Sequence, residues 1–401
     1  MPGRRWIILA VLFAARATTG FQFQSVGSAA NLLMRDLGID YSQVGMLLGA
    51  YLLPGVVVAF PAGLLGQRLD ERKLGLAGLA LMVISGIALS VSDGFVVALV
   101  ARTIGGVGAT IVILVATKMT TDWFDGREIV LAMSILQMSW PFGAMLALPT
   151  QAYIAQSFGW PAVMTSAAAC SALALCAFLF VSGPEQARSA QPAATGEAKL
   201  PGAVAVSITI AGVIWGAMNL ACILFFSYAP LVLVTQGSSP AAAASLTSLA
   251  IWFTILAIPS GGYLVHRLGE PIAAIIVCAL IAAAALALSV AGLHPAISCL
   301  VFGVAVGPMS GAILSLPSKV LAPRERAVGF GVFYTCFYVL MAVGPSAAGH
   351  LQDLWGSPSA ALIAGAALLA AIVPLALAFV ALSNLQRLAD VNQDAELRAA
   401  S

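Results

Sequence analysis

Long runs of apolar residues alternate with short polar segments along almost the whole chain. The runs are about 20 residues long, the length that an α-helix needs to cross a hydrocarbon core about 30 Å thick. Short alternating strands, which build membrane barrels, are not seen in the sequence. The pattern therefore predicts an all-α integral membrane protein with twelve transmembrane helices, at residues 6–30, 42–65, 74–92, 95–117, 129–154, 160–182, 203–231, 241–264, 272–292, 296–318, 326–350 and 357–382.

One longer polar segment, residues 183–202, interrupts this pattern midway along the chain. It is rich in Ala, Gln, Pro and Gly with scattered charges, a composition typical of a flexible, solvated linker. The chain is thereby divided into four expected parts: an N-terminal six-helix bundle at 1–182, the cytoplasmic linker at 183–202, a C-terminal six-helix bundle at 203–383 and a cytoplasmic tail at 384–401.

Similar short motifs recur in the two halves, in the same order and at a nearly constant spacing. Gly63 and Arg68 follow the second span, as Gly262 and Arg267 follow the eighth. The sequence Gly-Arg-Glu ending at Glu128 likewise matches Pro-Arg-Glu in the second half. This indicates duplication of a six-helix unit, with the copies related by an axis along the membrane normal.

The composition restricts the class of protein further. Hydrophobic residues make up 61% of the chain and charged residues 8%, against roughly 25% charged residues in soluble proteins. A net charge of +2 gives no reason to expect a nucleic-acid partner, and the lipid bilayer is the expected surrounding. The six cysteines lie inside apolar runs, and no metalloprotease or nucleotide-binding motif occurs. We therefore expect no enzyme activity, no cofactor and no metal.

The distribution of basic residues predicts the orientation in the membrane. Of the 18 lysines and arginines, Arg16 and Arg102 fall inside spans and Arg35 falls on one side, while the others fall on the opposite side. Because basic residues accumulate in cytoplasmic loops, both termini and the linker are expected in the cytoplasm. An even number of spans meets this requirement, and we expect a multi-pass protein of the inner (plasma) membrane.

Motifs at three places, taken in order, give the chain a resemblance to the major facilitator superfamily. The segment from Gly63 to Lys73 resembles the family signature between spans two and three, although Gln67 and Asp70 replace its usual acid and second glycine. Arg102 followed by Gly106 and Gly108 matches the pattern of the fourth span. Residues 123–128, Trp-Phe-Asp-Gly-Arg-Glu, resemble the entry to the fifth span in the anion, nitrate and cyanate porter branches.

This resemblance implies the major facilitator fold and transport by alternating access, in which the halves rock about a central site. In the family, the signature loop between spans two and three latches the halves together. The expected conformational latch here comprises Gly63, Arg68, Arg72, Arg127, Glu128 and Arg267. The resemblance also implies that spans one, four, seven and ten line the central cavity.

Two arginines inside spans are the strongest candidates for binding a solute. A charge at mid-membrane costs several kcal/mol, roughly 2.5–3.5 on insertion scales, so it is retained where it has a function. Arg16 shares one stripe of its helix with Gly20, Gln24 and Gly27, which suits a water-filled cavity or a close helix contact. With no acid inside a predicted span, two guanidinium groups favour a small anion, such as an organic carboxylate or an inorganic oxyanion.

The other polar and aromatic side chains of the spans complete the predicted binding site. Spans five, seven and eleven each carry an amide, an indole or a phenol at positions that could face the arginines. The predicted substrate-binding residues are Arg16, Gln24, Arg102, Gln137, Trp140, Trp215, Asn219, Tyr334 and Tyr338. The site would thus have a cationic N-terminal side and an aromatic, weakly polar C-terminal side.

Several alternatives remain open on the sequence alone. Arg102 could instead join helices by donating to backbone carbonyl groups, and the amides could serve only as interhelical contacts. The cargo could be neutral or zwitterionic, such as a short peptide, an amino acid or a drug, or the chain could be a non-transporting sensor. Transport could be coupled to a proton or to a counter-anion by symport or antiport. We expect a monomer.

Overall fold

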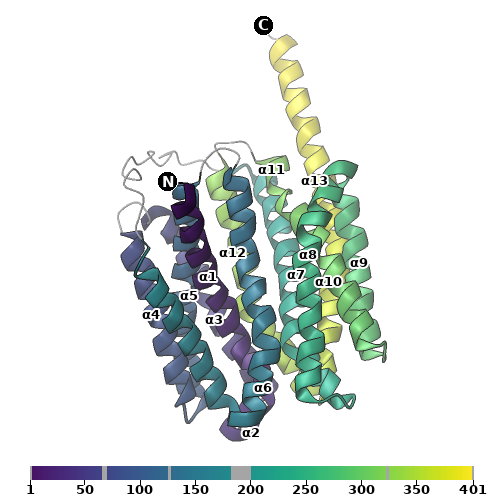
Figure 1. The fold of residues 1–401 in the computed structure, drawn as a ribbon. Coiled ribbons are helices and arrows are strands. Elements are labelled where there is room, and N and C mark those ends of the chain that lie inside the picture. The colour runs from purple at the N-terminus through teal and green to yellow at the C-terminus, as the bar shows by residue number, and fades with distance from the viewer. Residues whose placement is uncertain (1, 66–69, 125–127, 182–199, 322–324, 400–401) are drawn as a thin grey trace.

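The computed structural model describes residues 2–65, 70–124, 128–181, 200–321 and 325–399. Within these ranges the regular structure is entirely helical (Figure 1). The helices are α1 Pro2–Ser28, α2 Ala30–Leu37, α3 Tyr41–Leu65, α4 Glu71–Ser90, α5 Phe95–Trp123, α6 Glu128–Phe178, α7 Gly202–Thr235, α8 Pro240–Leu268, α9 Pro271–Val290, α10 Pro295–Leu314, α11 Pro317–Val320, α12 Arg326–Trp355 and α13 Ser359–Ala399.

These helices supply the twelve predicted spans. Ten described segments are long and apolar enough to cross a membrane. One of them, in α6, contains two predicted spans, because the backbone breaks at Gly159, where φ is +79°. A side chain is strained at that φ, which explains why glycine occupies the turn. The apolar stretch Tyr41–Val57 of α3 adds the remaining span.

Local sequence signals explain several helix starts. Proline is the first residue of α8, α9 and α10. Its missing N–H is harmless there, because the first N–H groups of a helix have no acceptor within the helix. Two features were not predicted. The short helix α2 follows the first span, and the residues expected as a tail continue α13 to Ala399. Of the expected linker, only residues 200–202 lie inside the described part of the chain.

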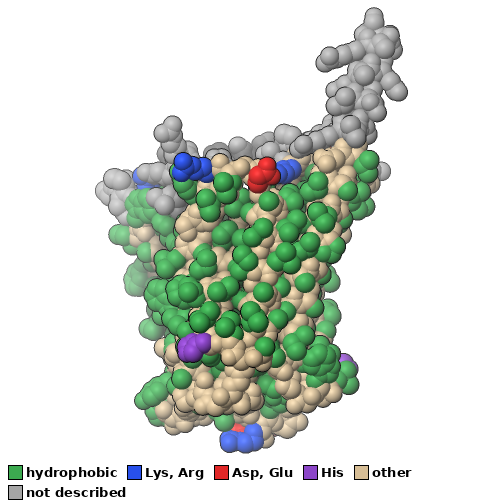
Figure 2. All heavy atoms as spheres, turned by 90° about the vertical axis from the view of Figure 1, so that its right-hand side faces the viewer, with side chains coloured by type: hydrophobic (Ala, Val, Ile, Leu, Met, Phe, Trp, Pro, Cys, Tyr) green, Lys and Arg blue, Asp and Glu red, His purple; other side chains and the backbone are tan. Residues whose placement is uncertain are grey.

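The two ends of the helix assembly differ in what they carry. The N-terminus and the C-terminal end of α13 lie at the top of Figure 1, here called the upper end, and α2 lies at the opposite, lower end. On the face shown in Figure 2, hydrophobic side chains are spread over the surface between these ends, while the lysine, arginine and acidic side chains lie at the ends. This surface suits a bundle that spans a bilayer.

Two hydrophobic cores correspond to the two halves of the chain. The first is built mainly from α1–α6 and the second mainly from α7–α13. Each core also receives side chains from the other half: Ala144–Ala152 of α6 join the second core, and Leu220–Leu231 of α7 join the first. The first segment of α6 begins at the upper end at Glu128 and ends at the kink at Gly159. Ala144–Ala152 lie in the half of this segment that is nearer to Gly159, so the halves pack together in their lower part.

Candidate functional site

Arg102, on α5, is fully buried and its guanidinium group is occupied by backbone carbonyl groups. Its Nε donates to Leu47 O (3.2 Å), its Nη1 to Gln22 O (2.8 Å) and its Nη2 to Phe23 O (2.6 Å). Its Cζ also lies 4.5 Å from the centre of the Tyr51 ring. Arg102 therefore joins α5 to α1 and α3, and because its side chain is fully buried it is closed to a solute in this conformation.

Arg16, halfway along α1, has a different environment. Its side chain is half-buried, and its Nη1 donates to the carbonyl oxygen of Leu136 on α6 (2.8 Å). Its Nε is buried without a hydrogen-bond partner among the described residues. A buried N–H without a partner carries an unrecovered desolvation cost, which an anion would remove. Arg16 thus keeps both its charge and a free donor for a ligand.

Two phenols on α12 face Arg16 from the other half of the chain. Tyr334 and Tyr338 both lie within electrostatic range of the Arg16 guanidinium group. Neither phenol has a hydrogen-bond partner within the described part of the chain, and Tyr334 is 37% exposed. The ring of Tyr338 packs so closely against Gly55 of α3 that there is no room for a Cβ at this position. At this point a cation of the N-terminal half and two phenols of the C-terminal half are close enough to interact electrostatically.

More aromatic rings extend this side of the site. Trp215 of α7 lies 6.3 Å from Phe333 and 6.2 Å from Phe337 between ring centres. Phe337 in turn contacts Tyr338 edge-on at 4.9 Å. Trp215, Phe337 and Tyr338 are only half-buried, so these rings retain surface that a ligand could cover.

Gln137 and Trp140 lie on α6 next to the carbonyl group that holds Arg16. Gln137 is exposed, and Trp140 is half-buried and packs against both hydrophobic cores. The Trp140 ring lies 5.6 Å from that of Phe23, and its carbonyl oxygen fills the space where Gly20 of α1 has no Cβ. Trp140 therefore lies where the halves meet, close to Arg16.

Two predicted ligand residues are engaged elsewhere. Gln24 is buried and its Nε2 donates to Phe226 O of α7 (3.0 Å), while Gly27 packs directly against Ser227. The stripe that continues from Arg16 is thus a close contact between α1 and α7. Asn219 Nδ2 donates to Trp215 O of its own helix (2.8 Å), which leaves its oxygen and one N–H for other partners.

The residues predicted as a conformational latch are largely untested by the structure. Arg68 and Arg127 lie outside the described residues, and Gly63 and Glu128 are placed only as residues of α3 and α6. Arg267 is exposed, and Arg72 donates to the carbonyl oxygen of Leu179 within the same half.

A contact between the halves that the sequence did not predict lies at the lower end. The carboxylate of Asp353, near the end of α12, accepts hydrogen bonds from the first backbone N–H groups of α3, those of Tyr41 (2.9 Å) and Ser42 (2.8 Å). A carboxylate is favoured there because a helix N-terminus carries partial positive charge. Nearby, Gly45 of α3 touches Pro345 and Gly349 of α12 touches Tyr41, so the backbones meet with no room for a Cβ.

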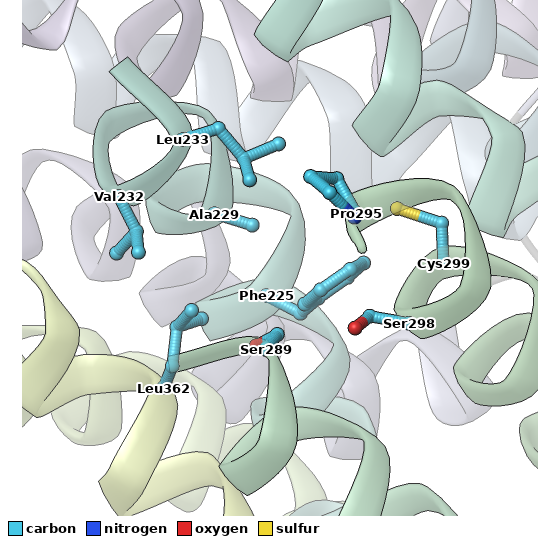
Figure 3. A pocket seen from close by; sticks show the side chains of 9 residues that line it. All are labelled: Phe225, Ala229, Val232, Leu233, Ser289, Pro295, Ser298, Cys299 and Leu362. Atoms are coloured by element: carbon cyan, nitrogen blue, oxygen red, sulfur yellow. The ribbon is translucent and has the colours of Figure 1, made fainter. Parts of the chain in front are cut away.

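Two cavities lie away from Arg16. The cavity in Figure 3, between α7, α9, α10 and α13, has a volume of about 10 Å³, and the Oγ of Ser298 has no described partner there. That is room for roughly one water molecule. A second, of about 390 Å³, lies between the halves at the lower end and includes Arg35 and Asp36. A hydrogen bond from Arg35 (2.8 Å) holds the pKa of Asp36 below its usual value.

Comparison with known proteins agrees with this architecture. The sequence model of the Major Facilitator Superfamily matches residues 12–345. The chain belongs to this superfamily. As a member of it, the chain shares its helical fold with a solved bacterial homologue of the human lysosomal transporter Spinster, in an inward-facing and unoccupied conformation. The TM-score is 0.68 at 16% identity, over 95% of this chain and 96% of the other.

Matches to curated transporters are shorter. The chain is 20% identical over 153 residues to a hexuronate transporter of Bacillus subtilis (strain 168), and 29% identical over 89 residues to the quinolone resistance protein NorA of Staphylococcus aureus. These segments span 38% and 22% of this chain, and 36% and 23% of the relatives. These short matches agree with membership of the superfamily but do not identify the substrate of this chain.

Proposed function

We propose that this major facilitator protein transports a small anion across the cell membrane, by secondary active or facilitated transport. The observation that carries the proposal is Arg16: a half-buried cation at mid-membrane with an unpartnered Nε and two phenols opposite. Guanidinium and phenol groups are all hydrogen-bond donors, and together they match the acceptors of a carboxylate or oxyanion. A cationic solute would be repelled at the same place.

The packing of the halves supports alternating access. The halves touch along their lower part. The contacts are Asp353 of α12 with the N-terminus of α3, the hydrogen bond from Gln24 to Phe226 O, and the glycines of α3 and α12. We propose that this closed end faces the outside, because the upper end carries most basic residues. The structure would then be an inward-facing conformation, with both termini in the cytoplasm and the two bundles, 1–182 and 203–383, moving as units.

The curated relatives support two cargo classes. A hexuronate is a carboxylate, which agrees with an anion at Arg16, whereas the name of NorA refers to resistance against a drug. A neutral or zwitterionic cargo is therefore the second candidate, and the half-buried rings of Trp215 and Phe337 favour it. Under that alternative, Arg16 would anchor one carboxylate of a zwitterion.

Uptake by purified protein in proteoliposomes tests the proposal. Labelled anions, a neutral dipeptide and a cationic drug would be compared, with an imposed pH gradient in one set and internal anion in another. We expect saturable uptake of anions alone. Stimulation by the gradient would indicate proton symport, and stimulation by internal anion would indicate exchange. Transport of the dipeptide or drug, with none of any anion, would reject the proposal in favour of the second candidate.

Replacing Asp353 with asparagine is expected to favour opening of the lower end. The change removes the charge that meets the N-terminus of α3 and one of two acceptors, and hydrogen bonds to charged groups contribute about 1.5–3 kcal/mol each. The share of molecules open at the lower end should rise about tenfold or more. Spin labels at Tyr153 and Leu354, both exposed, would report the distance between the halves in a background without the native cysteines.

The matched control for this change is Asp36→Asn. Asp36 is also an acid at the lower end, but its partners, the adjacent Arg35 and Trp160, belong to its own half. Asp36→Asn should therefore leave the distribution of distances between the two spin labels unchanged. An unaltered distribution in Asp353→Asn would show that the charge does not hold the lower end closed.

A further inference from the structure

The side chains around Arg16 limit the kind of anion that fits, provided that the proposed anion transport holds. We infer that the ligand is a singly charged organic anion with a flat aromatic body, an aryl monocarboxylate. The inference rests on three features of the described site: one available cation, two phenol donors beside it, and a wall of partly uncovered aromatic rings.

The charge of the ligand follows from the charges available inside the bundle. Of the two intramembrane arginines, Arg102 has each nitrogen bonded to a carbonyl oxygen and is fully buried. Arg16 is therefore the one intramembrane guanidinium group, among the described residues, that is only half-buried and has a nitrogen bonded to no carbonyl oxygen. A second negative charge on the ligand would enter a low-dielectric region without a partner, at a cost of several kcal/mol.

The head group of the ligand follows from the donors. Nη1 of Arg16 is held by Leu136 O, which fixes the guanidinium plane, while Nε remains free. The hydroxyl groups of Tyr334 and Tyr338 lie on successive turns of α12, within electrostatic range of Arg16 and without a described hydrogen-bond partner, so both are donors available to a ligand beside Arg16. A carboxylate has two oxygens with about four acceptor positions in one plane. It can therefore accept from the guanidinium group and from both phenols.

The body of the ligand follows from the rings. Phe337 lies between Trp215 at 6.2 Å and Tyr338 at 4.9 Å, and Tyr334 is 6.4 Å from Phe337. Four rings at such distances, each only partly covered, offer faces and edges for a further aromatic ring, since aromatic pairs favour centre distances of about 4.5–7 Å. Apolar surface of the ligand would be removed from water in the same step.

Hydrophilic anions fit this wall less well. A sugar acid would have to replace its bonds to water by bonds to side-chain amides or hydroxyls. One of the two N–H groups of the Asn219 side chain is already bound to Trp215 O, and Gln24 is buried against Phe226. Gln137 is the remaining exposed amide among the predicted ligand residues. An unsatisfied hydroxyl costs about 1–3 kcal/mol, so several would weaken binding substantially.

The test is a ranking of dissociation constants for four probes with the purified full-length protein in lipid nanodiscs. The probes are benzoate, terephthalate, galacturonate and nitrate, which separate the aromatic body from the number of charges and from the carboxylate itself. We expect benzoate to bind at least about tenfold more tightly than each of the other three. Phe337→Leu should raise the dissociation constant of benzoate about threefold to tenfold and leave that of galacturonate unchanged. Phe158→Leu, which alters an exposed ring away from the aromatic wall, should change neither dissociation constant.

The outcomes separate this inference from the proposed function. Galacturonate or nitrate binding as tightly as benzoate would overturn the aryl ligand while anion binding stands. Tighter binding of terephthalate would overturn the single charge. Binding of no anion, with binding of a neutral dipeptide or a cationic drug, would overturn both proposals. The ranking by the wild-type protein decides these cases even if Phe337→Leu does not fold.

Discussion

Replacing Arg16 with glutamine is expected to lower anion uptake at least about tenfold and up to about a hundredfold. The substitution keeps a side chain of polar character but removes the charge and the Nε donor that lacks a partner. Hydrogen bonds to a charged group contribute about 1.5–3 kcal/mol, which corresponds to this range of affinities. Initial rates in proteoliposomes, measured over a range of anion concentrations, would show whether the apparent affinity or the maximal rate is lost.

Two further substitutions make this result specific. Arg16→Lys retains the charge but cannot present a planar fork, and we expect an intermediate loss of uptake. Arg35→Gln removes an exposed guanidinium group at the lower end, paired with Asp36, and should leave uptake near the wild-type rate. If Arg16→Gln has normal stability and transports at the wild-type rate, Arg16 does not bind the solute. The proposal that the solute is an anion would then be rejected.

The sequence predicted the architecture because hydrophobic runs in a membrane protein carry strong, local information. The twelve spans follow from the length of the apolar runs. The fifth and sixth spans are separated by the kink at Gly159, two residues before Pro161. The helical course of residues 384–399 was missed because amphipathic, charged sequence does not distinguish a helix from a disordered tail.

The site was harder to predict because the same residue types serve packing and binding. Arg16 and Arg102 both lie inside spans, and only their neighbours in three dimensions distinguish their roles. Arg16 donates to one carbonyl oxygen, whereas Arg102 donates to three. Asp353 escaped notice for a related reason. In the sequence, an acid at the end of a span cannot be distinguished from an ordinary surface group. Its contact with the N-terminus of α3, more than 300 residues away, is seen only in the folded structure.

Replacing Arg102 with leucine is expected to lower stability by about 3 kcal/mol or more, with loss of folded protein. Leucine is apolar and occupies part of the same space, but it leaves the carbonyl oxygens of Leu47, Gln22 and Phe23 without their charged donor. It also removes the cation from the face of the Tyr51 ring and leaves unfilled volume in a fully buried position. Thermal denaturation followed by size-exclusion chromatography in detergent would measure the change.

The control for Arg102 is its neighbour Thr103, replaced by alanine. Thr103 is half-buried and its hydroxyl donates to Leu99 O of its own helix, so its loss should change the melting temperature little. The decisive comparison is between melting temperature and anion binding. A structural role predicts that Arg102→Leu melts at lower temperature with or without anion, and that the molecules still folded bind benzoate with nearly unchanged affinity. Unchanged melting without anion, combined with lost binding, would instead make Arg102 a ligand of the solute, because only a group that contacts the bound anion acts solely in its presence.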